Sequence, residues 1–157
     1  MPVGYIALGS NLGNRGENIA EAIRRLKEKG VAVTKVATII ETKPYGVTDQ
    51  PDFLNTAARV EFRGDAFALL DTLLAVEKEM GRKRLRHWGE RNIDIDLLLF
   101  DRQVINSERL TLPHAEMAKR DFVLRPLAEI AGEEVHPVLN TTIKELWENL
   151  LRGQENE

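Results

Sequence analysis

The period of the hydrophobic pattern changes repeatedly along the chain, and the order of these changes restricts the possible folds more than any other feature. Short runs of apolar and β-branched residues predict strands. The expected strands are residues 3–8, 31–42, 53–62 and 93–100. Apolar residues at helical spacing predict a helix that ends at Gly30 and a second helix over residues 65–80 that ends at Gly81.

The resulting order, β-α-β-β-α-β, is that of the ferredoxin-like split βαβ arrangement, an α+β sandwich. Helices at about residues 114–119, 122–131 and 141–151 are expected as C-terminal additions, and the polar tail 153–157 is expected to fray. The 157 residues are expected to form one domain, residues 1–157. A chain of this length can bury about two-thirds of the surface of its unfolded state, so a hydrophobic core is available.

Composition excludes several classes of protein. The chain has no cysteine, which excludes a disulfide framework, thiol catalysis and cysteine-ligated zinc, and which fits a reducing compartment. No apolar run approaches the ~20 residues of a membrane span, and the N-terminal residues do not resemble a signal peptide. The net charge of −3 does not indicate a nucleic-acid coat. We therefore expect a cytoplasmic monomer with no membrane or nucleic-acid partner.

The strand at residues 93–100 carries the most informative pattern. Strand side chains alternate, so Ile95 and Leu97 point into the core while Asp94 and Asp96 share the opposite face. Two like charges on one strand face repel each other, and a divalent cation removes that cost. Magnesium takes one or two carboxylates and fills its other positions with phosphates and water. The pattern is equally consistent with the polar face of an edge strand.

A cluster of positive charge immediately precedes this strand. Residues 82–91 contain five cationic side chains and one acidic side chain, namely Arg82, Lys83, Arg84, Arg86, Arg91 and Glu90. Clustered arginines offer paired donors to phosphate oxygens. Alone, such a run is most often a solvated loop, but next to paired aspartates it favours a triphosphate site.

The glycine-containing segment from Gly9 to Gly16 precedes a predicted helix. Such a segment could cradle an anion at the helix N-terminus, although a tight turn explains it as well. The chain contains no Gly-x-x-x-x-Gly-Lys-Ser/Thr motif, so it is not a P-loop enzyme.

Two further segments offer groups that suit a flat heterocycle. Phe53 and Asn55 are two positions apart on a predicted strand, so an aromatic ring and an amide face the same side. The segment 112–127 contributes His114 and Phe122. Core packing also explains Phe53, and His114 could simply cap or pack near a helix start.

Read together, six segments resemble the pyrophosphokinases of folate synthesis. They are Gly9-Ser10-Asn11-Leu12-Gly13, Thr42-x-Pro44-x-Gly46, Gln50-Pro51-Asp52-Phe53-Leu54-Asn55, Glu77-x3-Gly81-Arg82, Trp88-Gly89-x-Arg91-x-x-Asp94-Ile95-Asp96 and Leu112-Pro113-His114. The segments occur in the family's order from Tyr5 to about Pro137. The run from Arg91 to Asp96 is the most specific of them.

The resemblance implies an enzyme that transfers the pyrophosphoryl group of ATP to the hydroxymethyl oxygen of 6-hydroxymethyl-7,8-dihydropterin, with AMP as the other product. It implies two magnesium ions held by Asp94 and Asp96, and catalytic contacts from Arg82 and Arg91 to the triphosphate. The implied ATP-binding residues are Glu77, Arg82, Arg84, Trp88, Arg91, Leu98, His114 and Arg120. The implied pterin-binding residues are Thr42, Lys43, Tyr45, Phe53, Asn55 and Phe122, with the two phenylalanines stacking on opposite faces of the ring.

The chain departs from the family's pattern at four positions. Phe53 stands where tyrosine is common, and Lys43 stands where proline is common. Leu74 occupies a position expected to carry a polar residue that reaches adenine, and Ala115 occupies one that is often aromatic. A side-chain contact to adenine is therefore in question at position 74, and base stacking is expected to be weaker at position 115.

Two other functions are compatible with parts of the pattern. A metal-dependent nucleotidyltransferase also pairs a Gly-Ser turn with Asp-x-Asp, but there the two lie close together, whereas Ser10 and Asp94 are far apart here. An RNA-binding module on the same scaffold would need aromatic and basic residues on the strand that carries Asp94 and Asp96. The products formed from ATP distinguish the three functions.

Overall fold

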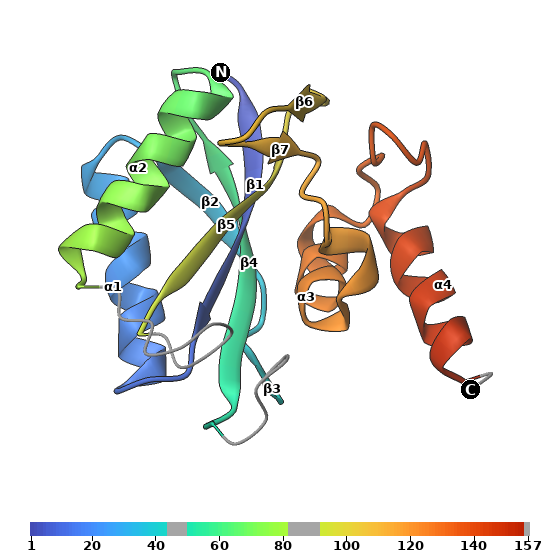
Figure 1. Cartoon of the computed structure of the whole chain (residues 1–157), viewed down its shortest axis with the longest axis horizontal. Coiled ribbons are helices and arrows are strands. Elements are labelled where there is room, and N and C mark those ends of the chain that lie inside the picture. Colours follow the sequence, from blue (N-terminus) through green and yellow to red (C-terminus); the bar gives the residue numbers. More distant parts are fainter. Residues whose placement is uncertain (44–49, 82–91, 156–157) are drawn as a thin grey trace.

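The computed structural model describes residues 1–43, 50–81 and 92–155, which form a sheet with helices on both faces (Figure 1). The strands of this sheet are β1 (Val3–Ser10), β2 (Ala32–Val36), β3 (Ile40–Thr42), β4 (Phe53–Glu61) and β5 (Asp94–Phe100). A small hairpin of β6 (Ile105–Asn106) and β7 (Thr111–Leu112) follows β5. The helices are α1 (Arg15–Glu28), α2 (Ala66–Glu79), the short 3-10 helix η1 (Met117–Lys119), α3 (Asp121–Ala131) and α4 (Ile143–Glu155).

The strand order confirms the predicted fold class. The order is β2-β4-β1-β5, and each neighbouring pair is antiparallel. β4 lies between β1 and β2, and β1 lies between β4 and β5, so the two β-α-β units are interleaved as in a ferredoxin-like fold. The C-terminal helices are additions to this arrangement.

The predicted strand at residues 31–42 is in fact two strands. β2 and β3 both pair with β4, and the chain between them leaves the ladder. At this break the Thr38 N–H donates a 2.8 Å hydrogen bond to the Glu129 carboxylate of α3. A helix distant in sequence therefore supplies a partner for an N–H at the outer edge of the sheet.

The sheet separates two hydrophobic cores. α1 and α2 cover one face, α3 covers the other, and α4 packs against α3 (Figure 1). Ile95 and Leu97 belong to the core under α1 and α2, whereas Leu98 and Leu99 belong to the core under α3 and α4. Two consecutive leucines can join the same core because the register of β5 against β1 shifts here and leaves one extra residue on β5.

The C-terminal helix is longer than the sequence predicts. α4 continues through Glu155, beyond the predicted end at about residue 151. The expected fraying of the tail stays a prediction. Leu146, Trp147 and Leu150 pack against the second core and hold the helix in place. In the part of the chain that the structure describes, no helix combines the length and the apolar character that a membrane crossing requires.

A buried histidine organises the connection between α3 and α4. His136 Nδ1 accepts hydrogen bonds from the backbone N–H groups of Val138 (3.3 Å) and Leu139 (3.0 Å). Burial lowers the pKa of His136 below its ordinary value, because desolvation disfavours the charged ring. The unfolded chain therefore binds the proton more tightly. The contribution to stability is present above the ordinary histidine pKa and is lost as the pH falls through the lower, folded-state pKa.

We expect a His136→Asn variant to lose less stability than the parent when the pH falls from about 7.5 to about 5.5. The asparagine oxygen can accept from the same two N–H groups and does not titrate. Chemical unfolding at both pH values measures the free energy of unfolding. The pH dependence of the free energy of unfolding should become smaller in the variant but should not disappear, because burial also lowers the pKa of His114. Equal losses in variant and parent would show that His136 does not contribute to the pH dependence.

Candidate active site

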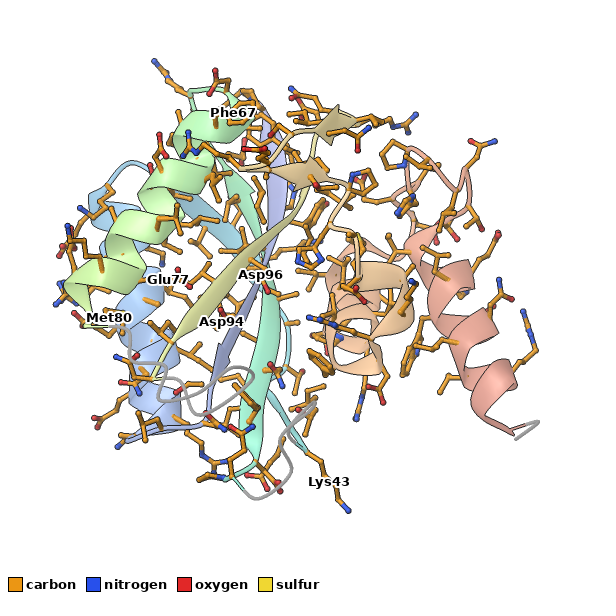
Figure 2. All side chains as sticks on the ribbon, in the orientation of Figure 1. Lys43, Phe67, Glu77, Met80, Asp94 and Asp96 are labelled. Carbon is orange, nitrogen blue, oxygen red and sulfur yellow. The ribbon has the colours of Figure 1, made fainter. Side chains whose placement is uncertain are left out.

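Asp94 and Asp96 lie where two pockets meet. Both residues are partly buried, and both line each of the two pockets. Figure 2 shows them along β5, between the layer that contains α2 and the layer that contains α3. The two carboxylates share one face of β5, as the alternation predicts, so a cation held there would be within reach of ligands in both pockets.

The first pocket brings together most of the residues that the resemblance assigns to the pterin. Of these residues, its lining contains Thr42, Lys43, Phe53, Asn55 and Phe122, and it also contains Arg120. They come from β3, β4 and α3, which are separated in sequence and joined by the sheet. Two aromatic rings and an amide around one pocket provide apolar surface and directional hydrogen bonding for a flat heterocycle.

Asn55 is held by its neighbour on β3. Its Nδ2 donates a 2.6 Å hydrogen bond to Thr42 Oγ1, and the pairing of β3 with β4 places Thr42 opposite Phe53. This contact orients the amide, so its role as a reader of a ligand edge does not depend on a freely rotating side chain.

Gly9 is a pocket residue that the sequence analysis missed. It pairs with Asn55 on one side and with Asp94 on the other, so its backbone forms part of the pocket wall between the two. A Cβ atom at this position would lie 2.7 Å from Asn55 Oδ1, closer than real Cβ contacts allow. A glycine within a strand signals such a close approach, but the sequence alone does not say what approaches.

The second pocket lies between α2, β5 and the segment that follows β6. Its lining includes Leu74, Glu77, Arg109, Thr111, His114 and Ala115. Leu74 is 48% exposed, so an apolar side chain faces this pocket where the resemblance leads us to expect a polar one. This is consistent with the absence of an adenine contact from that side chain.

Glu77 connects α2 to the part of β5 that carries the carboxylates. The Glu77 side chain is buried, and Oε2 accepts a 2.8 Å hydrogen bond from the Ile95 N–H. β5 lies at the edge of the sheet, so backbone groups on its outer side need partners other than a strand. Because Ile95 lies between Asp94 and Asp96, Glu77 restrains the backbone from which both carboxylates project (Figure 2).

We expect Glu77→Gln to be tolerated and Glu77→Ala to be harmful, since the amide oxygen of glutamine can still accept from Ile95. The alanine variant removes that acceptor, which should cost about 1–3 kcal/mol of the free energy of unfolding. It should also raise the magnesium concentration needed for half-maximal activity. Denaturant unfolding and a magnesium titration of the rate measure the two effects. A glutamine variant as impaired as the alanine variant would mean that the charge, and not the hydrogen bond, matters.

His114 is fixed by backbone contacts on both sides. The backbone N–H of His114 donates to the Leu98 carbonyl at 3.0 Å. The ring Nδ1 of His114 accepts from the backbone N–H of Glu116 at 3.2 Å. Burial lowers the pKa of His114, and the positive charge of Arg120 lowers it further. The neutral ring therefore carries its proton on Nε2, a donor suited to a phosphate oxygen.

Two of the residues predicted to contact ATP, Arg120 and Leu98, differ in their exposure to the pockets. The Arg120 guanidinium lies 5.7 Å from the centre of the Phe122 ring, and Arg120 lines the first pocket. The Leu98 side chain is completely buried in the second core, so it presents no surface to a nucleotide. Its visible role is to accept the His114 N–H through its carbonyl.

Arg109 was not predicted as a site residue, because its position depends on the β6–β7 hairpin. It lines the second pocket, forms an ion pair with Asp71 of α2 and lies 5.9 Å from the Phe67 ring centre. Thr111 follows it into the same pocket. The predicted site residues Tyr45, Arg82, Arg84, Trp88 and Arg91 lie outside the described residues.

The two carboxylates at the junction are a donor set that suits magnesium. Among the residues that the structure describes, no group of three or more histidine, cysteine, aspartate or glutamate side chains is arranged to hold a metal ion. A pair of carboxylates beside a pocket for an anionic ligand is the donor set that magnesium uses when the ligand and water complete its shell.

The fold and the site together define a class of protein. A ferredoxin-like sheet carries one pocket lined by two aromatic rings and an amide, a second pocket lined by a histidine and an arginine, and two carboxylates shared by both. This is the arrangement of a two-substrate transferase. The family model for 7,8-dihydro-6-hydroxymethylpterin-pyrophosphokinase matches residues 5–132, and the chain belongs to that family. The predicted pyrophosphokinase class is thereby confirmed, and the nucleotidyltransferase alternative is not favoured.

Individual relatives agree with this assignment. The chain is 46% identical over 132 residues to the 2-amino-4-hydroxy-6-hydroxymethyldihydropteridine pyrophosphokinase of Bacillus subtilis, which covers 83% of this chain and 79% of that protein. It is 42% identical over 138 residues to the protein of the same name from Haemophilus influenzae, which covers 87% of this chain and 86% of that protein.

Some relatives are much longer than this chain. The folic acid synthesis protein fol1 of Pneumocystis carinii is 42% identical over 147 residues, which are 94% of this chain but 20% of that protein. The crystal structure of Plasmodium falciparum HPPK-DHPS with pteroate matches with a TM-score of 0.79 at 18% identity, over 99% of this chain and 43% of that one. The structural match supports the fold, and this chain aligns with less than half of each of these longer proteins.

Proposed function

We propose that this chain transfers the pyrophosphoryl group of ATP to the hydroxymethyl oxygen of 6-hydroxymethyl-7,8-dihydropterin, a step of folate synthesis. The observation that carries the proposal is the position of Asp94 and Asp96, which line both the pocket suited to the heterocycle and the pocket suited to the nucleotide. A reaction that joins parts of two substrates needs such a junction, because the reacting atoms must meet there.

The first pocket is the proposed pterin site. Phe53 and Phe122 supply aromatic surface for the ring, and Asn55, oriented by Thr42, supplies hydrogen bonds for the amide and amine edge. Phe53 keeps the stacking surface of the tyrosine common in the family. The predicted contacts from Lys43, which is exposed at the end of β3, and from Tyr45 stay predictions.

The second pocket is the proposed ATP site. His114 and Arg109 are the groups suited to the triphosphate on this side, and Arg120 approaches from the first pocket. Leu74 and Ala115 leave an apolar surface for the base. Glu77 supports the strand beneath the phosphates, and Arg82, Arg84, Trp88 and Arg91 are proposed to complete the site from the basic segment.

Asp94 and Asp96 are the proposed ligands of two magnesium ions, which would neutralise charge on the phosphates when bound. The side chains then bind and orient the substrates and exclude water. The hydroxymethyl oxygen attacks the β-phosphorus, a new oxygen–phosphorus bond forms, and the bond to the oxygen of the α-phosphate breaks. AMP leaves with that oxygen, and the hydroxyl proton is released. No residue is assigned as a general base.

The products test the proposal directly. The protein is incubated with ATP, magnesium and 6-hydroxymethyl-7,8-dihydropterin, and nucleotides and pterins are separated by chromatography. We expect AMP and the pterin diphosphate in equal amounts. Pyrophosphate release would instead indicate nucleotidyl transfer, and no conversion of ATP would indicate a binding module. The cytoplasmic location, the monomeric state and the lack of a nucleic-acid or membrane partner stay predictions.

A further inference from the structure

Asn11 extends the contact between β1 and β4 beyond the end of their backbone ladder. The ladder ends with Ser10 paired to Leu54. Asn11 is 2% exposed, and its Nδ2 donates to Gln50 Oε1 at 2.8 Å and to the Pro51 carbonyl at 2.9 Å. The Asn11 side chain therefore continues the contact past the last rung, to the segment that leads into β4.

Arg15, four residues after Asn11 in the sequence, contacts the same part of the chain. It is the first residue of α1, and its guanidinium donates to the Asp52 carbonyl at 2.9 Å. The same group forms a 2.9 Å ion pair with Glu41 of β3. Asn11 and Arg15 are here called the β1–α1 clasp. The clasp therefore contacts β3 and the segment that leads into β4.

The clasp is itself held in shape. Asn18 Nδ2 donates to the Leu12 carbonyl at 2.9 Å and to Ser10 Oγ at 3.3 Å, and Ser10 is completely buried. These contacts account for the polar residues that follow Gly9 without an anion, and they favour the turn over the anion cradle. The segment is thus a rigid support, to which the chain at Gln50 and Pro51 is attached.

The clasp acts next to the residues proposed to bind the pterin. The chain that it holds enters β4 at Phe53 and reaches Asn55 two residues later, while Glu41 precedes Thr42 on β3. Aromatic stacking and amide recognition both depend on sub-ångström placement. We propose that Asn11 is a positioning residue for pterin recognition, acting through Gln50 and Pro51. The inference rests on the proposed function.

The isosteric change Asn11→Asp tests this inference. It replaces the Nδ2 amino group, which donates both hydrogen bonds, with one carboxylate oxygen that faces two carbonyl-type oxygens, while the volume stays nearly the same. The Pro51 carbonyl can only accept, so its contact with this oxygen becomes repulsive. We expect the dissociation constant for 6-hydroxymethylpterin, measured by fluorescence with a saturating non-hydrolysable ATP analogue and magnesium, to rise about tenfold or more. The dissociation constant of the ATP analogue should change by less than about twofold.

Asn14→Asp is the matched control, because Asn14 caps α1 by accepting from the Glu17 N–H and aspartate caps equally well. It should bind both ligands as the parent does. Arg15→Met provides a second variant that removes only surface contacts, so it should fold even if Asn11→Asp does not. We expect it to weaken pterin binding about threefold. Parent-like pterin binding in each clasp variant that folds, or equal losses for both ligands, would overturn the inference. A parent protein that makes no AMP would overturn the proposed function instead.

Discussion

Replacing Asp94 or Asp96 with asparagine is expected to lower kcat by about a hundred- to a thousandfold while the fold stays intact. The two carboxylates share one face of β5 and line both pockets, so each is positioned to hold a cation against the reacting phosphates. Asparagine keeps the volume and removes the charge. Single-turnover and steady-state rates at saturating magnesium measure the loss, and circular dichroism checks the fold.

The stability of these variants separates a metal site from a structural role. Removing one of two neighbouring negative charges should leave the melting temperature without magnesium unchanged or higher, because like charges on one strand face repel. Asp65→Asn is the matched control, since Asp65 caps α2 by accepting from the Ala68 N–H and lies outside both pockets. A variant at position 94 or 96 with turnover within about tenfold of the parent would contradict the metal assignment.

Removing the ring of Phe122 is the second change with a large expected effect. Phe122→Ala should weaken pterin binding by about 1–3 kcal/mol, or roughly 5- to 150-fold, if stacking on other aromatic rings is a guide. ATP binding should be nearly unchanged, because Phe122 lines the first pocket and not the second. Titration of each ligand into the variant measures both constants.

Phe122 also packs against the second core, so its loss has a structural cost that must be separated from binding. Phe122→Leu retains apolar volume and removes only the ring. Its melting temperature should stay close to that of the parent, while its affinity for pterin should be reduced as in Phe122→Ala. Phe53→Tyr should be tolerated, because it keeps the ring and adds a hydroxyl at the pocket. If Phe122→Ala melts at a lower temperature and binds pterin as the parent does, Phe122 is a packing residue only.

The structural features that sequence reasoning predicted correctly are local ones. Asp94 and Asp96 share a face because successive side chains on any strand point to opposite sides. The order of strands and helices likewise follows from changes in hydrophobic period, and it was sufficient for the fold class. The grouping of Phe53, Asn55 and Phe122 was predicted only through the resemblance, because α3 is far from β4 in sequence. In the structure, the packing of α3 on the sheet brings the three residues to one pocket.

The predictions that were incomplete involve partners distant along the chain. The break between β2 and β3 occurs where Thr38 bonds to Glu129 of α3, which no local propensity reveals. Leu98 follows the alternation of Asp94 and Asp96, yet C-terminal helices cover it and bury it in the core. Arg109 reaches the second pocket only because the β6–β7 hairpin folds beside α2.

The sequence by itself determined the fold class, the family and the pair of carboxylates, since these depend on periodicity and on motifs read along the chain. Only the tertiary structure decided how the support around the site is built. Gly9 becomes a pocket wall because the register of three strands places it between Asn55 and Asp94. Asn11 meets Pro51 because the sheet brings together two segments about forty residues apart. Such contacts depend on distances in space that a one-dimensional pattern does not contain.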